Sequence, residues 1–459
     1  MQTRRDQLHA YRFMTRRAMS ALVTGEPDAV EPPMRRITLM TVSGIMVAII
    51  VAAVFAVIGL LKGGGSNDWQ AEGAVVMEKE TGARYVMIDG QLHPAVNYAS
   101  AVLATGSTGP VEVLEASRGD LAKVDRGETI GVVGLPDSMP APDDLVSGPV
   151  TVCSQPRVEG VNVTAVVHVD VGTDQEARLI DPEHAVYVES FEGERFLLYE
   201  GRRHPVEQSV EAALQISATP VKVASAFLTA VPMGPGFQTP RVPGAGTQVS
   251  LAGQDLVVGQ VIEVDDGTFR VVLDQGVARV SEVQARLLRT AVLDGKRMDP
   301  VPMSFSSVIE MGEIDDSTSM ARAAGMDGLP EVLPTIAPGA AEAAGACVVF
   351  GDESTPDHLA LPGSDASSAP TSESEASRAG MADEVFVQPG KGLLAATQEG
   401  SVVYLVTGPG RAYPSQSIDL LGGFGYGVDD VVRIRAEVLG IIPDGAALDP
   451  VAARTPIGG

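Results

Sequence analysis

The 459-residue sequence has few aromatic side chains, few cysteines and few positive charges. Phe, Trp and Tyr make up 4% of the chain, whereas Gly (50) and Pro (31) are plentiful, and this balance favours short elements joined by many turns over long helical bundles. Asp and Glu (59) far outnumber Lys and Arg (33). The resulting net charge of −26 argues against nucleic acid as a partner, because phosphate binding needs clustered cations.

Motifs of the common enzyme classes are also missing. The nearest approach to a nucleotide-binding loop, Pro389-Gly390-Lys391-Gly392, lacks the upstream Gly and the Ser or Thr that would hold magnesium. The six histidines include no pair at metal-ligand spacing on one element. Adjacent acid pairs occur at Asp143-Asp144, Asp265-Asp266 and Asp315-Asp316. Such pairs occur in glycosidases and calcium sites, but in so acidic a chain solvated loop residues are the favoured interpretation, so we expect no catalytic, cofactor or metal site.

One long apolar run is present. Residues 37–61 contain no charged side chain in 25 positions, and a helix of that length crosses the hydrocarbon core of a membrane. A buried core helix would be shorter and carry a polar face. A cleaved signal peptide would have a shorter apolar region, a shorter leader and a small-residue cleavage site, so an uncleaved anchor is favoured.

The charge around this run predicts its orientation. Residues 1–36 hold seven arginines against four acids, whereas the chain beyond position 36 has 26 basic and 55 acidic residues, a net charge of −29. Arg35 and Arg36 directly precede the span, which places 1–36 in the cytoplasm and residues 62–459 outside. The leader has helical apolar periodicity. It is compatible with a helix on the anionic inner leaflet and with a docking helix for a cytoplasmic partner.

The only two cysteines, Cys153 and Cys347, both fall in the region assigned to the outside. Two thiols in an oxidising compartment most simply form a disulfide. Such a bond closes a loop of about 190 residues, and the chain-entropy model gives it a stabilisation of roughly 5 kcal/mol. It also predicts that the sequences around both cysteines belong to one domain.

The sequence repeats itself. RYVMIDGQLHPAVNYASAVL from Arg84 aligns without a gap with RFLLYEGRRHPVEQSVEAAL from Arg195, and each has an acid–Gly turn followed by His-Pro. We interpret the pattern as strand, tight turn and helix, with Gly in the turn and Pro in the first helical turn. Two weaker copies carry Arg279-Val280 and Tyr413-Pro414 in place of His-Pro. The turn and helix-start residues are Gly90, His93, Pro94, Gly201, His204, Pro205, Gly276, Gly410 and Pro414.

The two histidines have equivalent places, so they suggest either a shared ligand site or a structural polar residue at the turn. Their absence from the other copies favours the structural role. A second block, VKVASAFLTAVPMG from Val221, matches VRIRAEVLGIIPDG from Val432 and predicts a strand followed by a short helical turn. The fold class is therefore α+β. A single N-terminal transmembrane helix is followed by four strand–helix–strand repeats around a central β-rich domain.

The predicted domains are a cytoplasmic helix and linker (1–36), the span (37–61), repeat 1 (72–127), the first segment of the central domain (128–184), repeat 2 (185–240), repeat 3 (247–300), the second segment of the central domain (301–384) and repeat 4 (385–450). Residues 351–384 are rich in Ser, Ala and acids with almost no apolar pattern, which indicates a disordered insert. Trp69, the only Trp, directly follows the Gly-rich spacer after the span and suggests an anchor at the outer interface, although the spacer places it several residues beyond the span.

The order and spacing of these features resemble the EccB family, core membrane subunits of the type VII (ESX) secretion system. The resemblance runs from about Gln7 to Ala453 and includes the leader HAYRFMTRRAMSALVTGEP, the first repeat, the distant cysteines and the closing YLVTGPGRAYP…LGGFGYG…IIPDGAALDP. It implies four repeats around a central domain, similar to the cell-wall-binding subunit of a phage lysin. ATP hydrolysis has been suggested for the family, but no nucleotide motif here supports it.

The resemblance also implies partners: further copies of the chain, an FtsK/SpoIIIE-type ATPase, other membrane subunits and a membrane-anchored subtilisin-like protease. The function expected is a non-enzymatic scaffold that self-associates outside the membrane. The alternatives are a peptidoglycan-binding membrane module and, third, an extracytoplasmic ATPase or wall hydrolase.

Overall fold

The computed structural model describes residues 3–25, 33–62, 67–172, 177–293, 295–314, 317–351, 356–363 and 369–457. The acid pair at 315–316 and some residues of the predicted insert lie outside these ranges. The chain forms two compact units, Met1–Asp68 and Trp69–Gly459.

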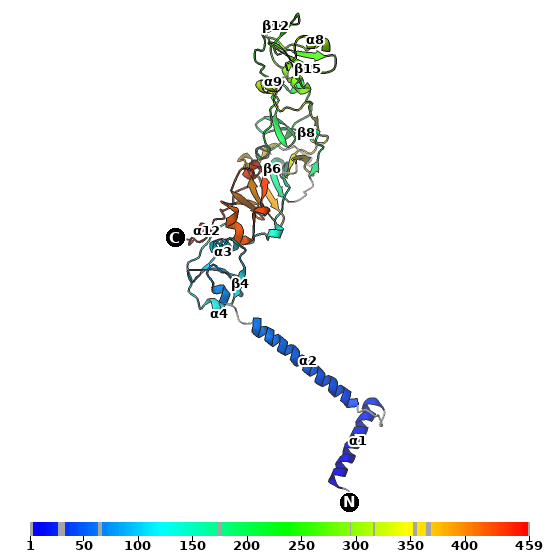
Figure 1. Ribbon diagram of the computed structural model, residues 1–459, viewed down its shortest axis with the longest axis vertical. Coiled ribbons are helices and arrows are strands. Elements are labelled where there is room, and N and C mark those ends of the chain that lie inside the picture. Colours follow the sequence, from blue (N-terminus) through cyan, green and yellow to red (C-terminus); the bar gives the residue numbers. More distant parts are fainter. Residues whose placement is uncertain are drawn as a thin grey trace. The chain divides into compact units, whose positions relative to one another are not determined.

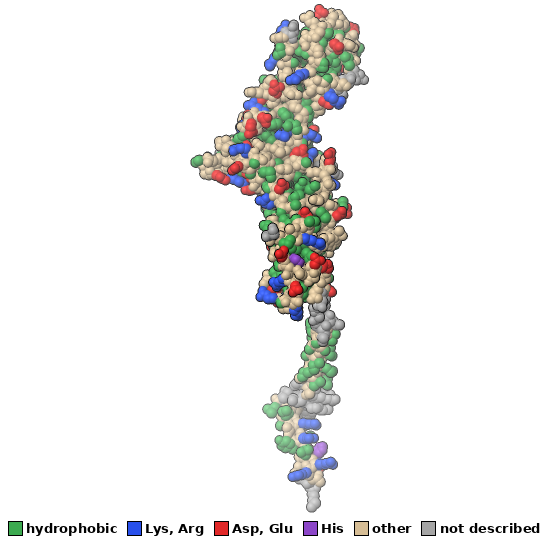
Figure 2. All heavy atoms as spheres, turned by 90° about the vertical axis from the view of Figure 1, so that its left-hand side faces the viewer, with side chains coloured by type: hydrophobic (Ala, Val, Ile, Leu, Met, Phe, Trp, Pro, Cys, Tyr) green, Lys and Arg blue, Asp and Glu red, His purple; other side chains and the backbone are tan. Residues whose placement is uncertain are grey.

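The first unit contains two helices, α1 (Arg4–Thr24) and α2 (Pro33–Lys62). A capping box between Thr3 and Asp6 starts α1, and Gly25, in the left-handed conformation, ends it. Within α2, residues Thr38–Val57 are long and apolar enough to cross a membrane, and none of that window is buried inside the protein. Figure 2 shows hydrophobic side chains around this helix and basic ones along α1. The helix predicted over 37–61 is therefore present.

The second unit, in which Figure 1 labels strands such as β4, β8 and β15, contains four sheets with one strand order. In each, three consecutive strands pair antiparallel, and a fourth strand returns to pair parallel with the first. We call them modules 1 to 4. The strands are β1 (Val75–Glu78), β2 (Arg84–Ile88), β3 (Gln91–Pro94) and β4 (Val113–Ala116) in module 1; β8 (His184–Glu189), β9 (Arg195–Tyr199), β10 (Arg202–Pro205) and β11 (Val221–Lys222) in module 2; β14 (Val261–Val264), β15 (Phe269–Leu273), β16 (Gly276–Val280) and β17 (Val301–Met303) in module 3; and β23 (Gly392–Thr397), β24 (Val403–Thr407), β25 (Arg411–Ser415) and β26 (Val432–Ile434) in module 4.

Every module also has two short helices in fixed places. The first helix connects the third and fourth strands, and the second follows the fourth strand. The first helices are α3 (Tyr98–Thr105), α5 (Glu211–Leu214), α7 (Glu282–Leu288) and η3 (Ile418–Phe424). The second helices are α4 (Arg118–Leu121), α6 (Ser225–Ala230), α8 (Phe305–Glu310) and α11 (Ala436–Ile441). The strand and short helical turn predicted for the block from Val221 to Gly234 are confirmed.

A central sheet lies between modules 2 and 4 and has the order β21-β6-β5-β19-β20-β7, with β22 also paired to β6. Its strands are β5 (Val150–Glu159), β6 (Asn162–Val171), β7 (Arg178–Leu179), β19 (Ala346–Phe350), β20 (His358–Leu361), β21 (Ser372–Glu373) and β22 (Glu384–Val387). Cys153 and Cys347 lie directly opposite each other on β5 and β19 and form the predicted disulfide. Both halves of the chain around them thus belong to one domain, as expected.

The remaining elements are a hairpin of β12 (Gln248–Leu251) and β13 (Gln254–Val257), and several short segments. The segments are η1 (Asn67–Gln70), η2 (Pro142–Asp144), α9 (Ser317–Ala323), β18 (Thr335–Ile336), α10 (Glu375–Arg378), η4 (Val428–Asp430) and α12 (Pro450–Ala453).

Shared apolar cores fix the order of the modules in space. Modules 1 and 4 share one core, with α3 against η3. Module 4, the central sheet and module 2 share the largest core, with α11 against α6. Modules 2 and 3 share a third, with α5 against α7. The order in space is therefore module 1, module 4, central sheet, module 2 and module 3, which differs from the order in the sequence.

The predicted role of the prolines is wrong. Pro94, Pro205 and Pro414 lie in third strands, and α3 begins four residues after Pro94, at Tyr98, with Asn97 as its N-cap. The repeated pattern is thus a β-hairpin followed by a helix. Proline is tolerated in these strands because its own N–H is not needed there: Ala95, directly after Pro94, donates to the carbonyl oxygen of Arg84.

The predicted alignment of the third copy is wrong by one position. Gly276 opens strand β16 opposite Leu273, so the turn consists of Asp274 and Gln275. Gly90, Gly201 and Gly410 do occupy turns with positive φ, as predicted. At Gly276 the need for glycine has another cause, because a Cβ there would collide with the carbonyl oxygen of Gly312.

Two predicted boundaries need correction. Residues 301–310, assigned to the central domain, belong to module 3, because β17 pairs parallel with β14 and α8 follows it. The described residues of the 351–384 segment are ordered: β20 is a buried strand of the central sheet, and β21 and α10 follow. The composition of the segment hid this because its buried apolar run is short, Leu359 to Leu361, within a long stretch rich in polar and acidic residues.

Candidate functional site

The acid pairs singled out in the sequence serve local structure where they are described. Asp265 accepts a hydrogen bond from the backbone N–H of Phe305, and Asp266 accepts from both the N–H and the hydroxyl of Thr268. These bonds hold the pKa of Asp266 below its ordinary value. Among the described residues, no group of His, Cys, Asp and Glu is arranged to hold a metal ion.

The Gly-Lys sequence at 389–392 has no nucleotide-loop geometry. A nucleotide loop needs free backbone N–H groups and a helix directly after the lysine. Here Lys391 lies in a turn before strand β23, and its ammonium group pairs with Asp144 at 2.8 Å. A Cβ at Gly392 would press against Pro140, so Gly392 serves a close approach of two chain segments.

His93 and His204 occupy equivalent places in third strands and make equivalent contacts. Nδ1 of His93 lies 3.0 Å from the carbonyl oxygen of Glu128, and Nδ1 of His204 lies 2.9 Å from that of Pro235. Each ring covers a glycine of the segment that runs parallel to its strand, because a methyl group at Gly127 or Gly234 would collide with it. Both histidines therefore tie that segment to the sheet, which supports the structural interpretation.

The same arrangement exists in module 4 with another side chain. Tyr413 is buried opposite Leu405, and a methyl group at Gly445 would lie 2.6 Å from its Cε1 atom. In module 2 the ring is enclosed: His204 is 4% exposed and its Nε2 has no hydrogen-bond partner. Burial lowers the pKa of His204, so the neutral imidazole is the favoured form.

An arginine at or next to the start of the second strand is ion-paired in modules 1 to 3: Arg84 and Arg195 open β2 and β9, and Arg270 is the second residue of β15. Arg84 pairs with Asp137 at 2.9 Å, and Arg270 pairs with Glu313 at 2.8 Å. Arg195 contacts Glu211 at 2.6 Å. These pairs involve acids from outside the two strands of the hairpin and hold neighbouring segments to each sheet.

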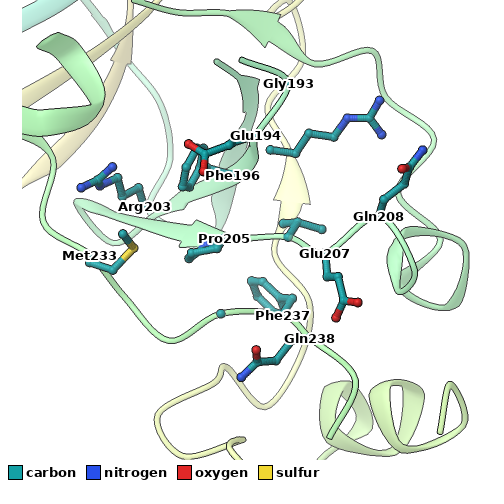
Figure 3. A pocket seen from close by; sticks show the side chains of 13 residues that line it. Gly193, Glu194, Phe196, Arg203, Pro205, Glu207, Gln208, Met233, Phe237 and Gln238 are labelled. Carbon is teal, nitrogen blue, oxygen red and sulfur yellow. The ribbon is translucent and has the colours of Figure 1, made fainter. Parts of the chain in front are cut away.

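A pocket of about 620 Å³ opens on module 2 (Figure 3). Phe196, Pro205 and Phe237 supply apolar lining. Figure 3 shows Arg203 and Met233 on one side, and Glu207 and Gln208 on the other. The remaining lining residues are Gly193, Glu194, Arg195, Val206, Gly236 and Gln238.

Arg203 is the least satisfied group of this pocket. Its guanidinium carbon lies 5.7 Å from the ring centre of Phe196, and its buried Nε has no hydrogen-bond partner. Burial lowers the pKa of Arg203, although the group stays charged. The pocket therefore offers a cation beside an aromatic face, with a carboxylate and amides across from it, and no nucleophile–base pair.

A second pocket of about 610 Å³ occupies the corresponding place on module 3. It is lined by the turn before β15 and by the end of β16, just as the first is lined by the turn before β9 and the end of β10. Arg279, Glu282, Gln284 and Asp327 are among its lining residues. The shared module architecture thus produces two similar shallow sites.

Sequence reasoning missed the contacts of the segment around Asp357. Its carboxylate accepts two hydrogen bonds from Arg435, at 2.9 and 2.6 Å, and it presses on Gly201 of the module 2 hairpin. Glu373, 5% exposed, accepts from Ser225 at the start of α6. Nothing in the local composition distinguishes these acids from solvated ones, so only the burial of both revealed their roles.

The residues on either side of the apolar window belong to different elements. Arg35 and Arg36 fall in the first turns of α2, ahead of the apolar window. Trp69 is 6% exposed and packs with Val76 and Leu121 in the core of module 1, so the interface-anchor interpretation is wrong.

Comparison with known proteins gives a consistent result. A family model described as "Type VII secretion system ESX-1, transport TM domain B" (EccB) matches residues 1–457. The ESX-1 secretion system ATPase EccB1 of Mycobacterium tuberculosis H37Rv is 28% identical over 324 residues, which cover 68% of this chain and 66% of EccB1. The ESX-3 secretion system ATPase EccB3 of the same strain is 29% identical over 322 residues, covering 64% and 58%. The aligned region thus spans 58–66% of these relatives' length, less than two thirds of each.

Solved structures share the fold. A chain of an intact ESX-5 inner membrane complex superposes with a TM-score of 0.63 at 22% identity, covering 100% of this chain and 96% of that one. A chain of the EccB3 dimer from the ESX-3 core complex gives 0.60 at 22% identity, covering 83% and 99%. Because the family model matches nearly the whole chain, from the leader helix to the last module, the protein belongs to the EccB family of type VII secretion proteins.

Proposed function

We propose that the chain is a structural core subunit of a type VII (ESX) secretion complex. In this role α2 anchors it in the cell membrane, and the second unit forms the extracytoplasmic region of the complex by self-association. The observation that carries the proposal is the family match over residues 1–457, which includes both the membrane-spanning helix and all four modules. The solved relatives belong to an ESX-5 inner membrane complex and to an EccB3 dimer. The first supports the proposed place in a membrane complex, and the second supports the proposed self-association.

The orientation belongs to the same proposal. Arg35 and Arg36 precede the span, and α1 carries five further arginines, so the positive-inside rule places α1 in the cytoplasm. The second unit then lies outside, which agrees with its disulfide. The four modules, with their common strand order, are proposed to be copies of one ancestral repeat around the central sheet.

We propose further that the chain does not hydrolyse ATP, although its curated relatives carry that name. Its one candidate lysine is engaged by Asp144, and a strand rather than a helix follows it. The partners proposed are an FtsK/SpoIIIE-type ATPase, other membrane subunits and a membrane-anchored subtilisin-like protease. Purified chain is expected to show no nucleotide hydrolysis above that of a Lys391→Ala variant.

The test of the main proposal is purification from native membranes in mild detergent through a tag after residue 459, followed by sizing and identification of what co-purifies. A particle in the megadalton range that contains an FtsK/SpoIIIE-type ATPase is the expected result. A lone monomer, with the ATPase in other fractions, would contradict the proposal.

A second function, binding of peptidoglycan, is favoured by one specific observation. The pockets of modules 2 and 3 are alike in place and size and have polar rims, which suits repeated contacts with a polar polymer. Co-sedimentation of the chain with purified peptidoglycan tests it, with Arg203→Ala and Arg279→Ala as variants. Equal retention of variants and parent would remove these pockets from consideration.

A further inference from the structure

The helices of the four modules pair in an alternating pattern. In the row formed by modules 1, 4, 2 and 3 in space, modules 1 and 4 meet through their first helices, α3 and η3. Modules 4 and 2 meet through their second helices, α11 and α6. Modules 2 and 3 meet again through first helices, α5 and α7. The pattern leaves a second helix at each end of the row: α4 in module 1 and α8 in module 3.

The cores behind these two end helices contain no residue of a second module, and the core behind α8 also includes Leu256 of the β12–β13 hairpin. Leu121 of α4 packs with Trp69 and Val76 of module 1. Val308 of α8 packs with Ile262 and Val264 of module 3. In the paired second helices, by contrast, Phe227 and Val438 lie in a core shared between modules.

The two end helices differ in their outward faces. At the two outward positions, one turn apart, α4 has Arg118 and its C-cap residue Ala122, while α8 has Phe305 and Ile309. Phe305 is 45% exposed and Ile309 is 56% exposed. The end at α4 is thus polar, and the end at α8 carries large apolar side chains.

The internal copies show that this apolar pair is not needed by the module itself. At the same positions α6 has Ser225 and Thr229, and α11 has Ala436 and Gly440. All four are small or polar, although both helices are well packed. Of these four helices, only α8 of module 3 has large apolar side chains on this face, and their exposure to water is unfavourable.

We propose that the outward face of α8, Phe305 and Ile309, is a docking surface for α8 of a second copy of this chain. The inference rests on the proposed self-association and names its surface. Because α4 at the opposite end is polar, head-to-tail contact between copies would leave the apolar pair against Arg118. A two-fold contact of α8 with α8 instead places Phe305 and Ile309 against the same pair in the partner, through a face that α6 and α11 leave exposed at Thr229 and Gly440.

The outward face of α8 is small, so we expect the contact to form between copies held in one membrane rather than free in solution. Stable dimers in solution bury roughly 800 Å² on each partner, far more than two side chains supply. Two anchored copies in one membrane, however, have a high effective concentration, so a small contact is enough. The experiment is therefore done with the full chain in its native membrane.

The test uses single cysteines, which is feasible because Cys153 and Cys347 are bonded to each other. Ile309→Cys probes α8, and Thr229→Cys and Gly440→Cys are matched controls at the equivalent, exposed positions of α6 and α11. A short bismaleimide is expected to link Ile309→Cys chains into dimers and to leave both controls monomeric.

Two results would overturn the proposal: equal cross-linking at all three positions, or none at Ile309→Cys. In the second case, sizing of the particle from the same membranes separates the two proposals. More than one copy per particle means that self-association stands and another surface provides it, whereas a single copy removes both. The variant Phe305→Ser with Ile309→Thr, which copies α6, should lower the dimer fraction in membranes about tenfold, and an unchanged fraction also contradicts the proposal.

Discussion

Adding a methyl group at Gly234 tests how tightly the segment around Gly234, which runs parallel to β10, is held to module 2. The Cβ of Gly234→Ala would lie 2.7 Å from Nδ1 of His204 and closer still to Cε1. The ring cannot turn aside without breaking its contact with the Pro235 carbonyl, and it is buried. Overpacking of this kind costs about 1–3 kcal/mol. We expect a loss of that size in the urea-unfolding free energy of residues 67–459, followed by circular dichroism.

Two other glycines make the test quantitative. Gly127→Ala meets His93 in the same way, but His93 is only half-buried and has room to shift, so its cost should be smaller. Gly440→Ala lies inside α11 with no neighbour within 4 Å of its Cβ, and should stabilise by about 0.5–1 kcal/mol through helix propensity. The reasoning is refuted if Gly234→Ala unfolds no more easily than Gly440→Ala.

Three further changes probe other contacts of the second unit. Replacing Cys153 and Cys347 by Ala opens a loop with a sequence separation of 194 residues, and should cost at most roughly 5 kcal/mol in the same urea assay, with no added effect of reductant on the variant. Asp357→Ala leaves Arg435 without its two hydrogen bonds and should cost about 1–3 kcal/mol, and unchanged proteolysis of residues 351–384 would contradict it. His204 has a pKa below its ordinary 6.5, so the unfolded chain binds more protons as pH falls below that value; stability should drop there, and His204→Tyr should flatten the drop in thermal unfolding.

The span, the disulfide and the four-fold pattern could be predicted because each leaves a local or countable signal. A charge-free run of 25 residues, two cysteines in 459 and a gapless alignment at fixed offset need no tertiary information. The helix start at Pro94 was mispredicted because His-Pro after a glycine turn is compatible with both a strand and a helix. Its place in β3 is decided by non-local contacts, since the neighbouring Leu92 bonds to Asp125 and Gly127 across the sheet.

Other features had no local signal. Glycine is needed at 276 because of the carbonyl oxygen of Gly312, 36 positions away, so matching it to the turn glycines shifted the alignment by one residue. Similarly, Asp357 and Glu373 occur in an acid-rich stretch of the kind that is normally solvated, and their burial follows from Arg435 and Ser225, both distant in the sequence. Acid-rich composition predicts disorder only on average, because a single buried ion pair can order such a segment.

The order of the modules in space has a consequence for how the chain completes its fold. Module 1 comes first in the sequence, but its shared core needs Leu421 and Ala453, and Arg454 donates to the carbonyl oxygens of Ala104 and Thr105 that end α3. Those carbonyls have no partner within the helix. Until residues near 454 are available, module 1 therefore has an open core and an uncapped helix. Removal of residues 446–459 should unfold module 1 while leaving the central disulfide intact, so hydrogen exchange would rise in α3 and not in β5.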